Sequence, residues 1–372
     1  MSLAGAASAP GTAAYAARHP EAAPGHFRAG AGGLTMSSIG AGTYLGAPGP
    51  RVDAGYAAAL ECALQAGVNV VDTAVNYRDQ RSERVAGATL GRLVEAGWLR
   101  REEVVVATKG GFLPGDSDRP GAAGAYVEQE LLRPRVIDAA DIVAGCHCMT
   151  PGYLRHQLAA SLANLGLDAV DVYFVHNPET QLQEVSRAEF GRRIRDAFAA
   201  LEEEVAAGRA GVYGVATWNG LRAEPQAADH LSLSVLLDAA REAGGDDHHF
   251  RALQLPLNLA MPEAVEMRNQ RNAGGAAMTV LDMAAAHGFT VMASASLLQG
   301  RLTGGLPDPL RAALDSTLRS DAQRALQFTR SAPGLTTALV GMSDPAHAEE
   351  NCAVSRVSPL PAERFRSLFV QR

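Results

Sequence analysis

Cysteine, aromatic residues and long apolar stretches are all scarce in this sequence. Only four of its 372 residues are cysteine and 5% are aromatic. Four cysteines are too few for a disulfide scaffold in a chain of this length. We therefore expect reduced thiols and a cytoplasmic protein. No stretch approaches the roughly 20 consecutive apolar residues of a membrane span, and no basic start precedes an apolar block. We therefore expect neither an integral membrane protein nor a signal peptide.

Positive charge is also in deficit. The chain has 33 lysines and arginines against 40 acidic residues, for a net charge of -7. This balance argues against a nucleic-acid partner, whose phosphates would require cationic contacts. The composition, 47% hydrophobic and 20% charged, is instead typical of a globular enzyme with a large core and a small-molecule substrate.

The apolar residues are organised in short runs that alternate with amphipathic helical runs. Residues 1–26 lack this pattern and are rich in alanine, glycine and proline, so we expect a disordered tail there. The expected strands span residues 34–44, 69–72, 104–108, 170–175, 211–216, 252–255, 290–293 and 337–340. The expected helices span residues 54–66, 82–96, 151–165, 188–207, 231–243, 276–287 and 322–330.

These runs predict an α/β fold. Strands without polar alternation suit a parallel sheet that is buried on both faces, either a closed (β/α)8 TIM barrel or an open doubly wound sheet. No G-x-G-x-x-G motif follows the first strand, so we favour the barrel, as one domain over 27–372. A long insert at 110–149, after the third strand, should lie over the carboxyl face of the barrel. It is either a cap over the substrate or a surface excursion.

Ionisable residues stand where three successive strands stop. Asp72 ends the second expected strand, with Tyr77 five residues later, Lys109 ends the third strand, and His176 ends the fourth. Each residue alone has an ordinary structural explanation, such as a helix cap or a solvent contact. In a barrel, however, the carboxyl ends of the strands surround one opening, where active sites form. The four side chains are therefore candidates for a shared site.

The motifs that carry these residues resemble those of the aldo-keto reductases. The similar segments are GVNVVDTAVNYRDQRSERVAGATL, ATKGG, SLANLGLDAVDVYFVHNP, GVYGVATWNG, LQLPLN, LLQGRLTG and GMSDPAHAEEN. The resemblance runs from about residue 27 to the C-terminal region and is interrupted by the insert. It implies a (β/α)8 barrel that interconverts an aldehyde or ketone and an alcohol by hydride transfer, with a nicotinamide cofactor.

The three strand-end residues and Tyr77 match the catalytic tetrad of that family. The resemblance implies that Tyr77 is the general acid in reduction and the base in oxidation. A close ammonium from Lys109 would lower the pKa of the phenol. Asp72 would hold Lys109 and balance its buried charge. His176 would orient the substrate carbonyl by a hydrogen bond.

The same resemblance suggests which residues bind the cofactor and line the pocket. Tyr44 and Trp218 are the aromatic candidates for the substrate pocket. The cofactor-binding candidates are Gly42, Thr43, Thr217, Gln254, Ser294, Leu297, Gly300, Gly341, Ser343, His347 and Asn351.

The chain departs from the family pattern at both ends of the cofactor. Ala216 stands where the family has a serine, and Ser294 stands where many members stack an aromatic ring on the nicotinamide. At the adenosine end, Asp344-Pro345 indicates the start of a helix, and the basic residues that hold the 2′-phosphate of NADP are missing. The cofactor is therefore expected to be NADP(H) or NAD(H). The same departures motivate an alternative: a repurposed barrel that keeps its cofactor for redox-neutral chemistry, or senses it as a binding subunit.

Two clusters contain metal-ligating residue types. Cys146-His147-Cys148 is too short to supply a four-ligand zinc site, and no second ligand pair lies nearby in the sequence. Residues 246–249, Asp-Asp-His-His, indicate a solvated loop. We expect no metal site.

Overall fold

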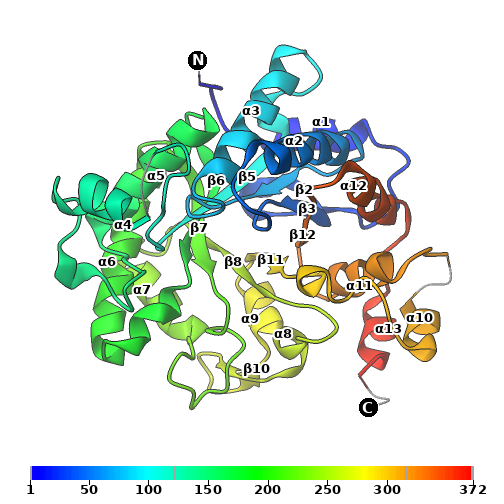
Figure 1. Ribbon diagram of the computed structural model, residues 1–372. Helices are drawn as coiled ribbons and strands as arrows, with labels where there is room; N and C mark the ends of the chain where they lie inside the picture. Colours follow the sequence, from blue (N-terminus) through cyan, green and yellow to red (C-terminus); the bar gives the residue numbers. More distant parts are fainter. Residues whose placement is uncertain (1, 120–122, 315–316, 370–372) are drawn as a thin grey trace.

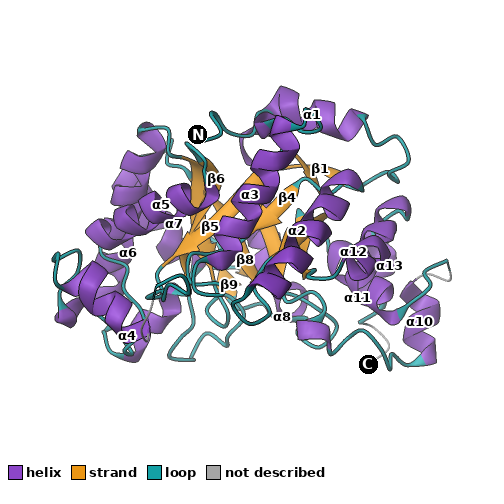
Figure 2. Cartoon of the chain, turned by 45° about the horizontal axis from the view of Figure 1, so that its top comes forward, coloured by secondary structure: helices purple, strands orange, loops and turns teal. Residues whose placement is uncertain are grey.

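Eight parallel strands close into a barrel in the computed structural model, which describes residues 2–119, 123–314 and 317–369 (Figures 1 and 2). Their order around the barrel is β3-β4-β5-β6-β7-β8-β11-β12, and β12 pairs with β3. The strands are β3 (Ile39–Gly42), β4 (Val70–Asp72), β5 (Val105–Gly110), β6 (Val170–His176), β7 (Ala210–Ala216), β8 (Phe250–Pro256), β11 (Thr290–Ser294) and β12 (Thr337–Gly341). The predicted (β/α)8 barrel is confirmed, and the open sheet is excluded.

Both faces of the barrel wall are apolar, which explains why the strands lack polar alternation. Val172 and Phe174 of β6 belong to the cluster that fills the barrel. Tyr173 and Val175, which point the other way, belong to the larger cluster between the strands and the helices. Successive residues of a strand face opposite sides, so every barrel strand except β3, whose alternate positions are Gly40 and Gly42, contributes to both clusters.

Helices surround the barrel, with the strands inside (Figure 2). The seven expected helices are present, within a few residues at each end. They are α2 (Pro50–Gln65), α3 (Arg81–Glu95), α5 (Pro151–Leu165), α6 (Arg187–Ala206), α7 (Leu233–Gly244), α9 (Val280–Ala286) and α11 (Asp321–Arg330). Further helices are α4 (Ala123–Tyr126), α8 (Glu263–Glu266), α10 (Asp308–Leu314), α12 (Pro345–Cys352) and α13 (Ala362–Ser367). Outside the barrel, short strands pair as β1 (Phe27–Ala29) with β2 (Thr35–Ser37) and as β9 (Gln270–Arg271) with β10 (Ala277–Met278).

The N-terminal segment is ordered, contrary to the expectation of a disordered tail at 1–26. Residues 9–17 form helix α1 (Ala9–Ala17), which Ser8 caps by accepting a hydrogen bond from the Gly11 amide at 3.0 Å. A side chain on Gly11 would collide with the carbonyl oxygen of Glu102, so the helix packs directly on the loop before β5. Tyr15 is fully buried, and its hydroxyl donates to the carbonyl oxygens of Leu64 and Val68. One aromatic anchor and one close backbone approach thus order a segment whose composition alone suggests disorder.

Removing this anchor should destabilise the whole domain. We expect Tyr15→Ala to lower the free energy of unfolding by about 3–5 kcal/mol, because it empties a buried aromatic site. Tyr15→Phe should cost about 1 kcal/mol, since it removes only the hydroxyl hydrogen bonds. Denaturant titration measures both values, with the half-exposed Val235→Ala as a control. An unchanged stability in Tyr15→Ala would show that the segment does not support the barrel.

The insert at 110–149 leaves the barrel at the end of β5 and returns just before α5. Its two ends are tied together, because the Leu113 amide donates to the Cys146 carbonyl at 2.8 Å and the Cys148 amide donates to the Gly111 carbonyl at 2.9 Å. The outer part packs a small core of its own against α5, formed by Leu131, Ile137, Cys148 and Tyr153. It lies beside α5 and α6 at the edge of the barrel (Figure 1).

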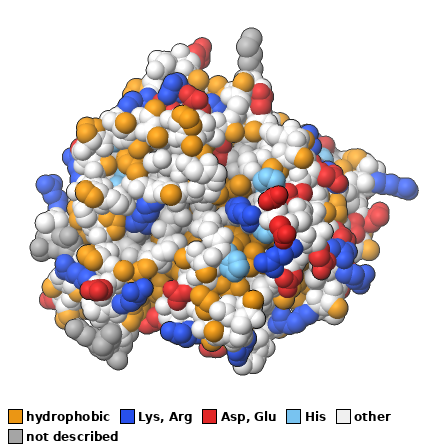
Figure 3. Space-filling view, turned by 180° about the vertical axis from the view of Figure 1, so that it is seen from behind, with side chains coloured by type: hydrophobic (Ala, Val, Ile, Leu, Met, Phe, Trp, Pro, Cys, Tyr) orange, Lys and Arg blue, Asp and Glu red, His pale blue; other side chains and the backbone are white. Residues whose placement is uncertain are grey.

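On the face shown in Figure 3, basic and acidic side chains are interspersed and do not gather in separate patches. Across the described residues, no helix combines the length and the apolar character that crossing a bilayer requires.

Candidate active site

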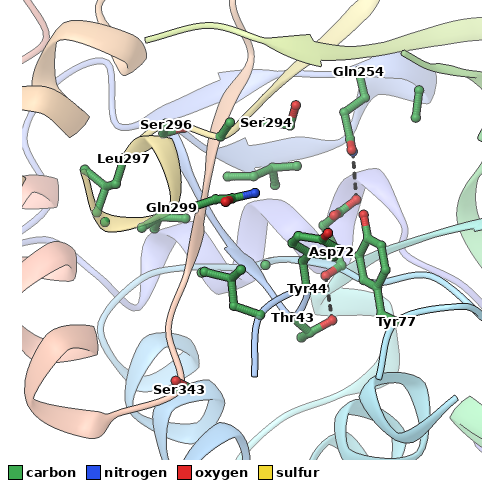
Figure 4. Close-up of a pocket in the computed structure, with 18 of the residues that line it drawn as sticks. Thr43, Tyr44, Asp72, Tyr77, Gln254, Ser294, Ser296, Leu297, Gln299 and Ser343 are labelled. Atoms are coloured by element: carbon green, nitrogen blue, oxygen red, sulfur yellow. Dashed lines mark hydrogen bonds between the residues drawn. The ribbon is translucent and has the colours of Figure 1, made fainter. Parts of the chain in front are cut away.

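A cavity of about 800 Å³ opens at the carboxyl ends of the barrel strands (Figure 4). Its volume suits a cofactor or another small molecule. The last residue of each of six barrel strands lines it: Gly42, Asp72, His176, Ala216, Ser294 and Gly341. The barrel therefore brings residues from distant parts of the sequence to one opening.

A buried ion pair lies at the floor of this cavity. The Lys109 Nζ atom is 2.9 and 2.7 Å from the two carboxylate oxygens of Asp72, and it also donates to the Thr73 carbonyl at 2.8 Å. Lys109 is fully buried and Asp72 is 4% exposed. Burial lowers the pKa of Lys109, and Asp72 opposes that shift. The three acceptors satisfy every donor of the ammonium, which fixes its position.

Tyr77 and His176 lie against this pair. The Lys109 ammonium is 4.8 Å from the centre of the Tyr77 ring, and the ring centres of Tyr77 and His176 are 5.8 Å apart. The structure thus brings all four tetrad candidates together. Three of them line the cavity, and Lys109 lies beneath them.

The electrostatics of Tyr77 differ from the expectation that Lys109 lowers its pKa. Burial and the nearby Asp72 carboxylate raise the pKa of Tyr77 well above its ordinary value. The reason is that Asp72 neutralises the ammonium, so the phenol meets a desolvated, nearly neutral pair. Burial and the Lys109 charge also lower the pKa of His176 well below its usual value. At neutral pH the phenol is therefore protonated and the imidazole is uncharged.

All the cofactor candidates border the same cavity. Thr43 and Gln254 lie near Asp72, whereas Leu297 lies on the other side of the view (Figure 4). The candidates that line the cavity are Gly42, Thr43, Thr217, Gln254, Ser294, Leu297, Gly300, Gly341, Ser343, His347 and Asn351. The Gln254 amide donates to Asp72 at 2.7 Å, which gives that carboxylate a second partner besides Lys109.

Two polar atoms in the wall indicate that the cavity holds a polar ligand. Thr217 Oγ1 and Asn351 Oδ1 are buried and find no hydrogen-bond partner among the described residues. Buried polar atoms are rarely left unpaired, because each costs about 1–3 kcal/mol. Both atoms belong to residues for which the sequence predicts cofactor contacts. The residues present therefore fit a nicotinamide dinucleotide, whose carboxamide and adenine supply such partners.

The loop after β11 is shaped around the cavity. Ala295 and Gln299 line the cavity, and together with Leu298 they adopt positive φ angles of 54°, 55° and 46°. Residues other than glycine rarely adopt this conformation, and it is concentrated at ligand-binding sites.

Aromatic side chains form the rim of the cavity. Tyr44 is 54% exposed and Trp218 is 40% exposed, and both line the opening. The backbone after Thr217 is held by Glu179, which accepts hydrogen bonds from the Trp218, Asn219 and Gly220 amides. These hydrogen bonds fix the start of the loop after β7, which carries Trp218.

Several residues that contribute to the site are not predicted from the sequence. Glu179 follows His176 by three residues, and Phe112 follows Lys109 by three residues, so nearness to a predicted strand end was the available signal. Within the described part of the insert, only Phe112 lines the cavity. Glu350, also missed, lines the adenosine end predicted from the sequence.

The structure does not place either cluster of possible metal ligands in a metal-binding arrangement. Among the described residues, no three His, Cys, Asp or Glu side chains converge on a common point. In the first cluster, both ring nitrogens of His147 already have hydrogen-bond partners.

The profile of the Aldo/keto reductase family matches residues 38–368. The chain belongs to the aldo/keto reductase family. It is 30% identical over 148 residues to the NADH-specific methylglyoxal reductase of Escherichia coli K12, covering 38% of this chain and 39% of that protein. It is 31% identical over 160 residues to a D-threo-aldose 1-dehydrogenase from a Pseudomonas species, covering 42% of each. These matches span about two fifths of each relative's length.

Solved structures of other members share the barrel over nearly the whole chain. An aldo/keto reductase from Klebsiella pneumoniae in complex with NADP and acetate is 21% identical, with a TM-score of 0.60, and covers 91% of this chain and 92% of that one. The glycerol dehydrogenase of Gluconobacter oxydans is 19% identical, with a TM-score of 0.61, and covers 93% and 94%. At this level of identity the comparison shows the fold.

Proposed function

We propose that this aldo/keto reductase is an NAD(P)H-dependent oxidoreductase that interconverts an aldehyde or ketone and an alcohol. One observation carries the proposal: a phenol, an imidazole and a buried carboxylate–ammonium pair meet at one end of a cavity sized for a cofactor and a small substrate. The family match and the complete acid–base set do not favour the alternative of redox-neutral chemistry or cofactor sensing.

The tetrad accounts for the proton transfer. When bound, the cofactor supplies the hydride in reduction and accepts it in oxidation. Tyr77 donates the proton to the carbonyl oxygen, and its raised pKa keeps that proton available at neutral pH. As the phenol becomes phenolate, the ammonium of Lys109 stabilises the new charge, and Asp72 holds that ammonium in place. His176, uncharged, orients the carbonyl through a hydrogen bond.

Residues of the wall would hold the cofactor. Thr217 and Gln254 would bind the nicotinamide carboxamide, and Asn351 would bind the adenine. The backbone after β11 would pass along the pyrophosphate through Leu297 and Gly300. Each of these residues lines the cavity.

The lining favours neutral substrates. Among the described lining residues, no lysine or arginine is present, and the charged side chains are the carboxylates Asp72 and Glu350. An anionic substrate would find no counter-ion here. Small neutral carbonyl compounds, such as the methylglyoxal and aldoses that name its relatives, fit this chemistry.

An assay with purified protein tests the proposal. We expect oxidation of NADH or NADPH with neutral aldehydes or ketones, and slower turnover of 2-oxo acids of similar size. Because the lining offers no cation to a 2′-phosphate, fluorescence titration should show that NADPH binds no more tightly than NADH. The absence of turnover with every neutral carbonyl would refute the activity. NADPH binding more than about tenfold tighter would refute the cofactor prediction.

We place the chain in the cytoplasm, where a reducing environment keeps cysteines as thiols, because all four of its cysteines are unpaired. Its net charge of -7 supports a small-molecule partner and not a nucleic acid.

A further inference from the structure

The two ends of the insert lie next to the catalytic centre. Phe112, near its start, and His147, near its end, form an antiparallel bridge. The structure puts this bridge directly beside His176. His147 is fully buried, as is its neighbour Cys148.

A chain of hydrogen bonds with a single direction ends on the backbone of His176. The His147 Nε2 atom is 2.7 Å from the His176 carbonyl oxygen. A carbonyl oxygen only accepts, so Nε2 carries the hydrogen and Nδ1 is the acceptor. Gln181 donates to that Nδ1 at 2.8 Å, and Arg193 donates to the Gln181 side-chain oxygen at 2.6 Å. The tautomer of His147 is thus fixed from both sides.

The His176 ring is held at its buried Nδ1 side by packing against other rings and not by a hydrogen bond. The Nδ1 atom of His176 is buried and has no partner among the described residues. The Phe112 ring lies edge-on to it, with centres 5.0 Å apart, and the same ring also contacts His147 at 5.4 Å. Tyr77 packs on His176 as well.

Gly111 shows how closely these parts fit. Its φ of 144° lies in the range that favours glycine, and a side chain there would come within 2.8 Å of both His147 Nε2 and the His176 carbonyl oxygen. Only a glycine lets the insert pass between the two histidines.

We propose that the two ends of the insert position His176 for catalysis. His147 anchors the backbone of His176, and Phe112 fixes the orientation of its ring. In this assignment His147 is a positioning residue. Phe112, which lines the cavity, also forms the wall that limits the size of the substrate beside His176. The proposal rests on the proposed function, because it gives the insert a part in that reaction. It does not require the insert to cover the substrate.

Variants at His147 separate the hydrogen bond from simple packing. His147→Leu keeps the volume but loses the donor, and we expect kcat to fall about 10- to 100-fold, as for a small misplacement of a catalytic group. The Kd for the cofactor should stay within about twofold, because His147 does not line the cavity. His147→Gln retains a donor and should recover most of the lost kcat.

Phe112→Leu tests the wall. It should raise kcat/KM for bulky carbonyls relative to small ones, since a smaller side chain widens the cavity beside His176. The matched control is Arg133→Ala, at an exposed ion pair with Glu128 in the same insert, which should leave all constants unchanged.

A spectroscopic readout does not depend on turnover. Nitrogen-15 NMR of the histidine rings should show His147 as the neutral Nε2–H form, and it should stay neutral above about pH 5, since burial lowers its pKa to about 4. An Nδ1–H tautomer, or wild-type kcat in a folded His147→Leu variant, would overturn the proposal. If His147→Leu fails to fold, the tautomer and the His147→Gln kinetics decide. Failure of the proposed function looks different, because the unaltered protein would then turn over no carbonyl at all.

Discussion

Tyr77→Phe should abolish carbonyl reduction while leaving the fold and cofactor binding intact. The substitution removes only a hydroxyl, and the phenyl ring can still pack between Tyr44 and His176. The lost group is the proposed proton donor, and general acid catalysis of this kind contributes about 10²- to 10⁴-fold to a rate. We expect kcat to fall by about that factor, measured by cofactor absorbance under saturating substrate.

The control is the same change at Tyr126, a half-buried tyrosine of the insert that does not line the cavity. Tyr126→Phe should retain full activity. Because burial raises the pKa of Tyr77, the phenol stays protonated as the pH rises. Reduction by the unaltered protein should therefore hold its rate from about pH 6 to about pH 9. Full activity in Tyr77→Phe would assign proton transfer to another group, and His176 would be the first to test.

The barrel and the placement of the tetrad could be predicted because both depend on local sequence. Apolar runs such as 170–175 specify strands that are buried on both faces, and Gly or Pro at the ends of helical runs limits their boundaries. Once the strands are known, barrel topology alone places Asp72, Lys109 and His176 at one opening. No long-range side-chain contact has to be known for that step.

The features that were not predictable depend on contacts between distant residues. Helix α1 is ordered because Tyr15 inserts beside residues about 50 positions away, which composition cannot reveal. The direction of the Tyr77 pKa shift depends on how fully Asp72 neutralises Lys109, and therefore on distances. The sequence suggests His147 only as a possible metal ligand, because its contact with the His176 backbone depends on the three-dimensional fold.

Lys109→Met should damage both stability and activity, because it leaves a buried carboxylate without its counter-ion. The Asp72 carboxylate is 4% exposed, and water cannot replace the ammonium freely. Removing one partner of a buried pair typically costs about 3–5 kcal/mol. We expect a loss of that size in the free energy of unfolding, measured by denaturant titration. Carbonyl reduction should fall at least about 100-fold, since nothing then stabilises the Tyr77 phenolate.

The double variant Asp72→Asn/Lys109→Met separates these two effects. An uncharged asparagine can still accept from Gln254, as Asp72 does at 2.7 Å, and no buried charge is left unpaired. Stability should therefore recover by several kcal/mol relative to Lys109→Met, as for other buried pairs replaced together. Activity should not recover, because the ammonium is still missing. Recovery of both would mean that Lys109 serves only to neutralise Asp72, whereas recovery of neither would mean that the pair does not govern the stability of the barrel floor.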